Sequence, residues 1–449
     1  MRQEGYYCTN NYKEDYQFRA PVTAWDESSK YAHWRNRKKD QPFFAVMNFT
    51  ATHESGLFEP YGFRQVETRH YQSGDKNYKW IQNGLPDSKN KTDEAETPIH
   101  ISKDTKFKVP PYLVDNEVTQ RDMWKLYNNI AEMDKQVGAV LKQLEEDGLL
   151  ETTIIMFYGD HGGPLPREKR LIYDSGLNTP MIIRFPNKIN AGTKFNQLIS
   201  FVDFAPTLLS LINKKPKKHM QGQAFLGAYQ SQKPRKYIHA AADRFDAETD
   251  AIRAVRDQQF KYIRNYKPEK GYYLPVAYRE KIPAMKELLK LRDEGKLNEI
   301  QKQWFRENKP KEELFDCAND PYELNNLANN SEYKVKLNEL SSEMDSWLTS
   351  INDNPNLPEA DLIKKLWNGK KSKAKTALPI INFENNNKVT ISCATEGASI
   401  GYKTNSKSKN WKVYTRPFNI SKSKSLIVKA HRIGFLPSND VNFKVPIIK

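Results

Sequence analysis

An aspartate and a histidine stand together after a short apolar run, and two glycines follow them directly. The run, residues 154–158, is rich in β-branched and aromatic residues and predicts a buried parallel strand. Asp160 and His161 would then leave the sheet where the backbone turns. Ligands of open α/β sheets bind beyond the carboxyl ends of strands. The pair therefore indicates a metal or polarised-anion site, although aspartate before glycine is also ordinary turn chemistry.

The neighbouring segments predict an α/β arrangement around this pair. Apolar strands are expected at 42–49 and 180–186. Between them, apolar residues at steps of three and four from 126 to 144 predict one amphipathic helix that ends near Asp147. Strand, helix and strand in this order favour a mostly parallel sheet.

Two further segments complete this first part of the chain. A helix is expected to begin near Phe201, with Asp203 as its candidate cap. Residues 64–108 are polar and aperiodic, and they predict a long insertion that either faces the substrate or is a plain surface excursion.

The sequence pattern changes after about Lys214. Residues 237–266 favour antiparallel strands, and 284–305 form a charged helical stretch. A basic linker follows, and short alternating strands with turn signals then predict a small β-sandwich. The expected domains are a catalytic domain at 1–213, a C-terminal subdomain at 214–368, a linker at 369–378 and a β-sandwich at 379–449.

Composition restricts the partners of the chain. Its 449 residues carry a formal net charge of +16, and lysine-rich surfaces attract polyanions. Most lysines are nevertheless expected on solvated faces, with the densest run at 214–218. Zinc-finger, RRM-like and heptad patterns are missing, which argues against nucleic acid as the partner. No apolar run is long enough to predict a membrane span, and three scattered cysteines give no disulfide framework.

Several motifs recur in a fixed order along residues 5–328. They are Thr52-His53-Glu54-Ser55, Asp160-His161-Gly162-Gly163, Arg167 to Gly176, Arg253 to Asp257, Glu313 to Asp316 and Asp320 to Leu327. This series resembles the type I, formylglycine-dependent sulfatases, and within them the heparan N-sulfatase branch. The resemblance implies an alkaline-phosphatase-like α/β fold, a mostly parallel sheet with helices on both faces, joined to a small α+β C-terminal subdomain. The all-β appendage resembles the C-terminal domain of chitobiase and β-hexosaminidases, where Trp411 and Tyr414 either stack on sugars or pack in the core.

The resemblance assigns a divalent metal to the first pair. Asp160 would give a carboxylate oxygen to calcium, which prefers oxygen ligands. His161 stands where many sulfatases place asparagine and others histidine. Because imidazole is an unusual calcium ligand, it shifts the preference toward manganese or zinc.

The resemblance also assigns the catalytic and substrate-binding residues. His53 matches the family's general acid, and Lys169 matches the lysine that contacts the sulfate, with Arg167 and Arg170 as competing alignments. Lys13 matches a second family lysine, but Asp15 stands in place of the companion histidine. The remaining candidates for the substrate pocket are Arg167, His239, Asp243, Arg244 and Arg256. A structural or surface role is the alternative for each of these residues.

The family's nucleophile motif has no counterpart in the chain. Sulfatases carry Cys/Ser-x-Pro-x-Arg, whose first residue becomes formylglycine, and neither form occurs here. The family's N-terminal Asp-Asp metal ligands also lack a match before Gly5. The chain is therefore expected to lack an N-terminal segment. Loss of a first strand exposes backbone donors and apolar side chains, which predicts poor solubility or marginal stability.

The sequence thus predicts a sulfatase that hydrolyses sulfate esters or N-sulfate groups with the aid of a divalent metal. Its expected partner is a sulfated polysaccharide or glycosaminoglycan, and the family places it in the periplasm, outside the cell or in the lysosome. Two alternatives stay open. One is a non-catalytic glycan-binding remnant, consistent with the missing nucleophile. The other, less favoured, is a phosphohydrolase of the alkaline phosphatase superfamily, because the eight histidines show no second metal cluster.

Overall fold

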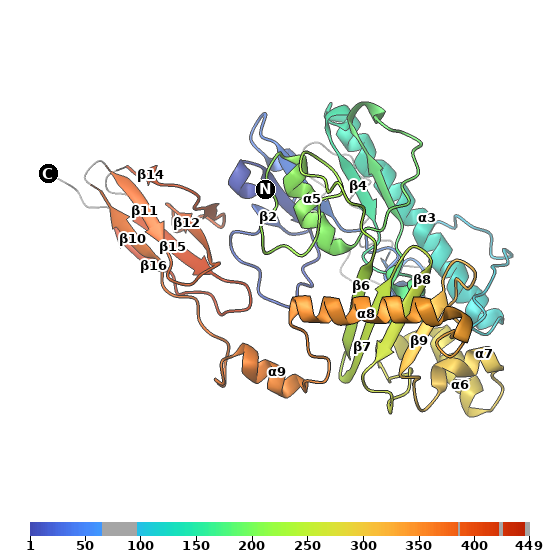
Figure 1. The fold of residues 1–449 in the computed structure, drawn as a ribbon. Coiled ribbons are helices and arrows are strands. Elements are labelled where there is room, and N and C mark those ends of the chain that lie inside the picture. Colours follow the sequence, from blue (N-terminus) through green and yellow to red (C-terminus); the bar gives the residue numbers. More distant parts are fainter. Residues whose placement is uncertain (65–96, 385–386, 422–424, 445–449) are drawn as a thin grey trace. The chain divides into compact units, whose positions relative to one another are not determined.

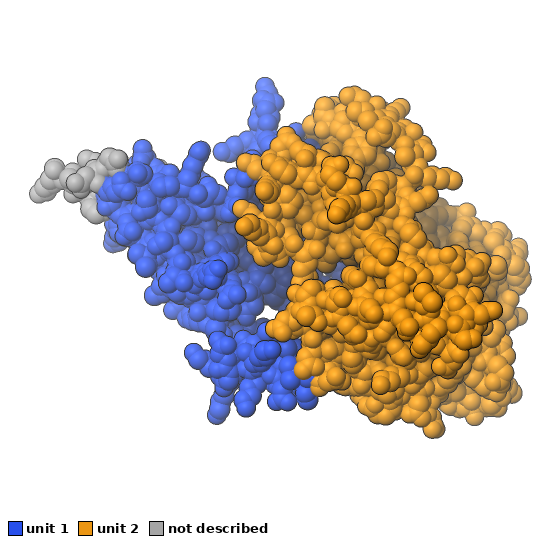
Figure 2. All heavy atoms as spheres, viewed as in Figure 1, with its two compact units in different colours: residues 1–48, 357–449 blue, residues 49–356 orange. Residues whose placement is uncertain are grey.

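A computed structural model describes residues 1–64, 97–384, 387–421 and 425–444 (Figure 1). The chain divides into two compact units, one made of residues 1–48 with 357–449 and the other of residues 49–356 (Figure 2). Within the described ranges, no helix combines the length and apolar character that a bilayer crossing requires. Most of the predicted insertion at 64–108 lies outside the described residues.

The first unit contains a small parallel sheet near the N-terminus. Its order is β2-β1-β3, with β1 at Tyr7–Asn11, β2 at Glu27–Ser28 and β3 at Phe43–Met47. Both pairings of β1 are parallel. The short 3-10 turns are η1 (Arg2–Glu4) and η2 (Trp34–Asn36). The strand expected at 42–49 is therefore confirmed as β3, in a parallel pair.

Two antiparallel sheets make up the C-terminal part of the same unit. One has the order β10-β11-β14 and the other β13-β12-β15-β16. Val389, Leu426 and Val428 are fully buried between apolar neighbours, and Tyr414 packs against this core. The bounds are α9 (Glu359–Leu366), β10 (Ile380–Phe383), β11 (Lys388–Ser392), β12 (Ser399–Lys403), β13 (Lys412–Val413), β14 (Phe418–Asn419), β15 (Ser425–His431) and β16 (Val441–Lys444).

The second unit begins with the predicted amphipathic helix. Helix α3 spans Glu117–Glu146, and the Asn116 side chain caps its first turn by accepting from the Thr119 amide. Its C-cap is Asp147, which confirms the expected end. The short helices of this part of the unit are α1 (Ser55–Phe58), η6 (Leu150–Thr152), α4 (Asp174–Leu177), η7 (Pro186–Lys188), η8 (Phe201–Asp203) and α5 (Phe204–Leu211).

The strand before Asp160 exists, but its predicted pairing is wrong. Among the described residues, strand β4 (Ile155–Tyr158) pairs only with β5 (Met181–Arg184), and the two run antiparallel. Neither strand is fully buried, and Ile182 is 64% exposed. A short apolar run predicts a strand, but its periodicity carries no information about the direction of its neighbour.

A four-stranded antiparallel sheet forms the second half of this unit. Its order is β6-β7-β8-β9, from Ile238–Phe245, Glu248–Arg256, Phe260–Asn265 and Glu312–Asp316. Helix α8 (Lys334–Ile351) crosses one face (Figure 1), where Val255, Tyr262 and Leu314 pack against Leu340 and Met344.

The opposite face of this sheet belongs to a second apolar core. Ile252, Ile263 and Phe315 pack there with residues of α6 (Pro283–Asp293). The remaining elements are η9 (Arg279–Lys281), α7 (Glu299–Lys302), η10 (Gln303–Phe305) and η11 (Ser331–Tyr333). The antiparallel strands and the helical stretch expected after residue 237 are thereby confirmed.

Candidate active site

Asp160 and His161 lie in the turn directly after β4. The Asp160 side chain is 76% exposed, and its Oδ2 is 3.6 Å from His161 Nε2. His161 Nδ1 is 2.7 Å from the Gly162 carbonyl oxygen, which can only accept, so Nδ1 carries the ring proton. The Nε2 lone pair of the neutral ring is then left beside the Asp160 carboxylate. An oxygen and a nitrogen donor this close together fit two ligands of one divalent ion.

The two glycines after this pair lie in close packing. A Cβ at Gly162 would collide with the carbonyl oxygen of Ser175, and one at Gly163 with the carboxylate of Glu168. The Gly162 amide also donates to the Gly176 carbonyl oxygen at 2.8 Å. The turn that presents Asp160 and His161 is therefore held against the segment that begins α4.

Glu168 is a buried acid within the same loop. Its carboxylate accepts from the Leu165 amide at 3.0 Å and from the Tyr112 hydroxyl at 3.3 Å. Burial raises the pKa of Glu168 to about 7, because these hydrogen bonds only partly offset the loss of water.

His53 stands just before the short helix α1. Its Nδ1 lies 2.8 Å from Ser55 Oγ and 3.3 Å from the Ser55 amide nitrogen. Because an amide N–H can only donate, Nδ1 is an acceptor and the neutral ring carries its proton on Nε2. The ring also meets Tyr278 edge-on, with 6.3 Å between centroids.

Glu54, the next residue, binds the predicted sulfate lysine. Its Oε1 is 3.1 Å from Lys169 Nζ, and Arg170 donates to both carboxylate oxygens at 2.8 Å. Burial opposes the charge of Glu54, but the hydrogen bonds and charges of Arg170 and Lys169 outweigh it and lower its pKa to about 2. Two cations thus share one buried carboxylate, and the charge of Asp246 also favours the charged form of Arg170. The motif Thr52-His53-Glu54-Ser55 contained this acid, but nothing in the sequence indicated its partners.

Arg167, one of the two alternatives to Lys169 as the sulfate-contacting residue, is buried in the protein. It is 5% exposed, and it donates to the carbonyl oxygens of Tyr322 at 2.9 Å and Glu323 at 3.0 Å. Its guanidinium also lies over the rings of Tyr112 and Tyr173, at 4.7 and 4.1 Å from their centroids. As placed, Arg167 fixes the loop that carries Lys169.

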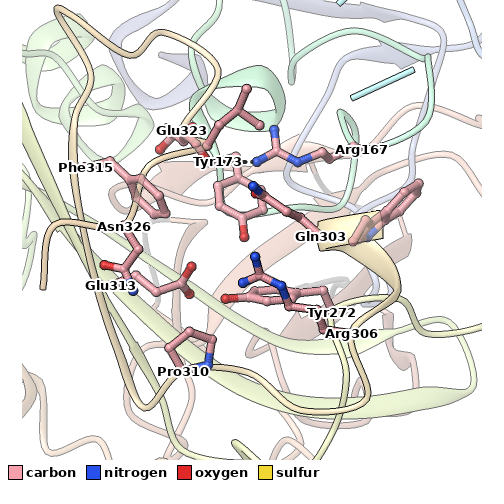
Figure 3. Close-up of a pocket in the computed structure, with 12 residues that line it drawn as sticks. Arg167, Tyr173, Tyr272, Gln303, Arg306, Pro310, Glu313, Phe315, Glu323 and Asn326 are labelled. Atoms are coloured by element: carbon pink, nitrogen blue, oxygen red, sulfur yellow. Dashed lines mark hydrogen bonds between the residues drawn. The ribbon is translucent and has the colours of Figure 1, made fainter. Parts of the chain in front are cut away.

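A small polar cavity lies beside Arg167 (Figure 3). Glu313, Tyr272 and Arg306 line it from the C-terminal half of the unit. Burial raises the pKa of Glu313, which accepts from Asn265 at 2.8 Å. His53, Lys169 and Asp160 are not among the lining residues, so this cavity is separate from the candidate catalytic groups.

Arg256 belongs to a buried ion cluster. Its Nη2 is 3.1 Å from Asp174 Oδ2, while the Lys261 ammonium lies 2.5 Å from Asp174 Oδ1 and 2.7 Å from Glu323 Oε1. Asp174, Cys317 and Glu323 present ligand atoms within 4.8 Å of one another. Lys261 already supplies the cation there, and burial raises the pKa of Cys317 to about 12, so this trio does not fit a metal site.

The other predicted pocket residues lie along β6. His239 stacks on Trp347 and contacts Glu343 at 3.0 Å, on the face that α8 covers. Asp243 pairs with Arg253 at 2.6 Å and is 57% exposed. Arg244 donates to the Asp246 carbonyl oxygen. Their assignment to a substrate pocket stays a prediction.

Lys13 belongs to the other compact unit. Its Nζ lies 3.2 Å from Asp15 Oδ2, and its side chain is 35% exposed. Its role as a second sulfate-side lysine also stays a prediction.

Comparison with known proteins gives the family. Residues 3–214 match the family model described as Sulfatase, and residues 159–307 match N-sulphoglucosamine sulphohydrolase, C-terminal. An ulvan-active sulfatase of Formosa agariphila is 67% identical over 445 residues, 98% of this chain and 74% of that protein. The human N-sulphoglucosamine sulphohydrolase is 23% identical over 334 residues, 70% of this chain and 62% of that protein. A solved protein in complex with D-glucosamine-2-N,6-O-disulfate aligns with TM-score 0.45 and 19% identity, covering 72% and 69% of the two chains.

These matches confirm the predicted family and, with it, the alkaline-phosphatase-like α/β fold class. Members of this family generally depend on a divalent metal. The similarity of the C-terminal β domain to that of chitobiase stays a prediction. This chain belongs to the sulfatase family.

Proposed function

We propose that this chain forms the sulfate-binding and proton-donating part of a glycan sulfatase, with ulvan as the first candidate substrate. The ulvan-active relative supports this glycan because it is 67% identical over nearly the whole chain. The observation that carries the site is the cation pair of Lys169 and Arg170, held by buried Glu54 next to His53.

The proposed chemistry follows from the charges that change during hydrolysis. Transfer of a sulfuryl group needs stabilisation of its negative charge, and the leaving oxygen or nitrogen needs a proton. Lys169 is the proposed ligand of the sulfate oxygens, through its ammonium. His53 is the proposed acid, and Nε2 is the nitrogen that gives up the proton. In the protonated ring Nδ1 also carries a hydrogen, which the Ser55 hydroxyl can accept in place of the contact with the Ser55 amide.

Asp160 and His161 are the proposed metal-binding residues of this chain. A divalent cation there would neutralise negative charge on the bound sulfate group. Calcium is the first candidate, and manganese or zinc the alternative, because one donor is an imidazole.

The cysteines of this chain do not fit a formylglycine precursor. Cys8 and Cys317 each have asparagine, not the proline of the family motif, two positions later. Cys393 is followed by alanine and threonine, not by the proline of the family motif. None of the three cysteines therefore matches the site at which the family forms formylglycine.

Sulfate release from a panel of sulfated glycans tests this proposal. The panel contains ulvan, a heparan-type N-sulfated glycan and chondroitin sulfate, each given to the chain alone and to a version extended upstream with a Cys-x-Pro-x-Arg segment. We expect release from ulvan by the extended version. Release from the N-sulfated glycan, and from no other member of the panel, would indicate that the substrate is a sulfamate. Binding of ulvan without release by either version would favour the alternative function, a non-catalytic glycan-binding protein.

A further inference from the structure

Glu54 connects the two loops that carry the proposed acid and the proposed sulfate lysine. It follows His53 in the chain, and its side chain is 1% exposed. The side chains of its partners Lys169 and Arg170 are 19% and 16% exposed, so each reaches from the protein interior to the surface. We propose that Glu54 is a positioning residue that fixes the Lys169 ammonium against the loop of His53 for sulfate binding. This inference rests on the proposed function and deepens it.

The three contacts are divided unequally between the two cations. Arg170 uses two nitrogens on the two carboxylate oxygens, whereas Lys169 makes one contact with Oε1. An ammonium has three N–H donors, so Lys169 keeps two for an anion on its exposed side. Arg170 balances the carboxylate, and Glu54 can therefore hold Lys169 without cancelling its charge.

The main chain of Lys169 is fixed as well. Its amide donates to the Gly163 carbonyl oxygen at 3.0 Å, in the turn that follows His161. A free lysine side chain loses rotamer entropy when it becomes ordered. Because Glu54 orders the side chain before an anion arrives, this cost does not fall on anion binding.

Positioning and simple charge predict opposite effects when Glu54 is neutralised. Glu54→Gln removes a negative charge beside two cations, so a purely electrostatic role predicts tighter binding of an anion. A positioning role predicts weaker binding, because Lys169 loses its fixed orientation. Glu151→Gln is the matched control, since it removes a half-exposed carboxylate that pairs with Arg184 in the same unit.

Chemical labelling tests the contact without reference to sulfate. The full chain and its variants are treated with acetic anhydride, and acetylation of Lys169 is followed by mass spectrometry. We expect Lys169 to be acetylated several-fold faster in Glu54→Gln than in the wild type, and at the wild-type rate in Glu151→Gln. Equal rates in all three proteins would overturn the inference.

Calorimetric titration with inorganic sulfate tests the consequence for binding. We expect about tenfold weaker binding in Glu54→Gln, the effect of one charged hydrogen bond, and an unchanged affinity in Glu151→Gln. Unchanged or tighter binding in Glu54→Gln would overturn the positioning role. A wild type without sulfate affinity would instead refute the proposed function, and the labelling result would still decide whether Glu54 holds Lys169.

A second variant covers the case in which Glu54→Gln does not fold. Glu54→Asp keeps the charge and shortens the reach toward Lys169. We expect it to keep the wild-type circular dichroism spectrum, to bind sulfate more weakly and to expose Lys169 to acetylation. A wild-type sulfate affinity and a wild-type acetylation rate of Lys169 would contradict a role that depends on the length of the Glu54 side chain.

Discussion

The guanidinium of Arg167 donates hydrogen bonds to the carbonyl oxygens of Tyr322 and Glu323, at 2.9 and 3.0 Å. These contacts tie the loop after β4 to the segment that follows β9. Glu323 in turn accepts from the Asp174 amide and contacts Lys261 at 2.7 Å. The loop that carries Lys169 is thus anchored to the C-terminal sheet of the same unit.

The anchor predicts a loss of stability when the arginine fork is removed. Arg167→Lys keeps the charge but cannot reach both carbonyl oxygens or lie flat on two rings. We expect the free energy of unfolding to fall by about 2–4 kcal/mol, from charged hydrogen bonds and cation–π contacts. Urea denaturation measures this loss, with Arg184→Lys as a more exposed control. A loss no larger than that of the control would refute the anchoring role.

The raised pKa of Glu168 predicts a pH-dependent gain for its neutral analogue. The pKa of Glu168 is about 7 in the folded protein and about 4.3 in the unfolded chain. The contribution of Glu168 to the free energy of unfolding is therefore complete below pH 4 and is lost as pH rises through 7. Glu168→Gln does not titrate, and its amide can still contact Leu165 and Tyr112. We expect it to be more stable than the wild type at pH 8, by up to about 3 kcal/mol, and to lose this advantage at pH 5. Thermal melts of both proteins at pH 5 and pH 8 measure this change. The same stability difference between variant and wild type at both pH values would contradict the raised pKa of Glu168.

Gly162 is predicted to tolerate no side chain. A Cβ there meets the backbone oxygen of Ser175, which cannot move without moving α4. We expect Gly162→Ala to lower the free energy of unfolding by at least about 2 kcal/mol. Gly138→Ala is the control, because open space surrounds Gly138 within α3 and alanine should stabilise that helix. Equal stability of the two variants in urea would show that the turn after β4 is not packed as described.

Metal binding at Asp160 and His161 is tested by thermal stability. An ion that binds only the folded protein raises the melting temperature as its concentration rises above the dissociation constant. We expect calcium or manganese to raise Tm in the wild type and to have little effect in Asp160→Asn or His161→Ala. Asp293→Asn removes a similarly exposed carboxylate and should keep the full rise. The same rise in all variants would place the ion elsewhere.

The family, the main elements and the strand-end pair could be predicted because each leaves a local pattern. The helix at Glu117–Glu146 shows its apolar periodicity and its caps, and the C-terminal strands alternate with turn signals. Asp160 and His161 follow a run of β-branched and aromatic residues, so their position at the end of a strand could be predicted without tertiary information. The antiparallel direction of β4 and β5 could not be predicted in this way, because strand pairing depends on contacts between distant segments.

The partners within the candidate site could not be predicted for the same reason. Glu54 and Lys169 are 115 positions apart, and neither residue type indicates that the acid is buried. Arg167 and Lys169 are equally basic and two positions apart, yet only the fold shows that Arg167 points into aromatic and carbonyl neighbours. Charge alone made the three basic residues interchangeable in the sequence, whereas their hydrogen bonds distinguish them.

Lys169 and His53 are the residues proposed to serve sulfate hydrolysis. The most direct test of these roles is kcat/KM for sulfate release from ulvan by the version extended with the nucleophile segment, compared among Lys169→Met, His53→Ala and the control Lys296→Met. Lys296 is exposed and pairs with Glu294 on the surface. We predict a loss of about 100-fold or more in the first two variants, as expected for groups at developing charge, and less than about twofold in the control. Wild-type rates in Lys169→Met and His53→Ala would contradict the proposed roles of both residues.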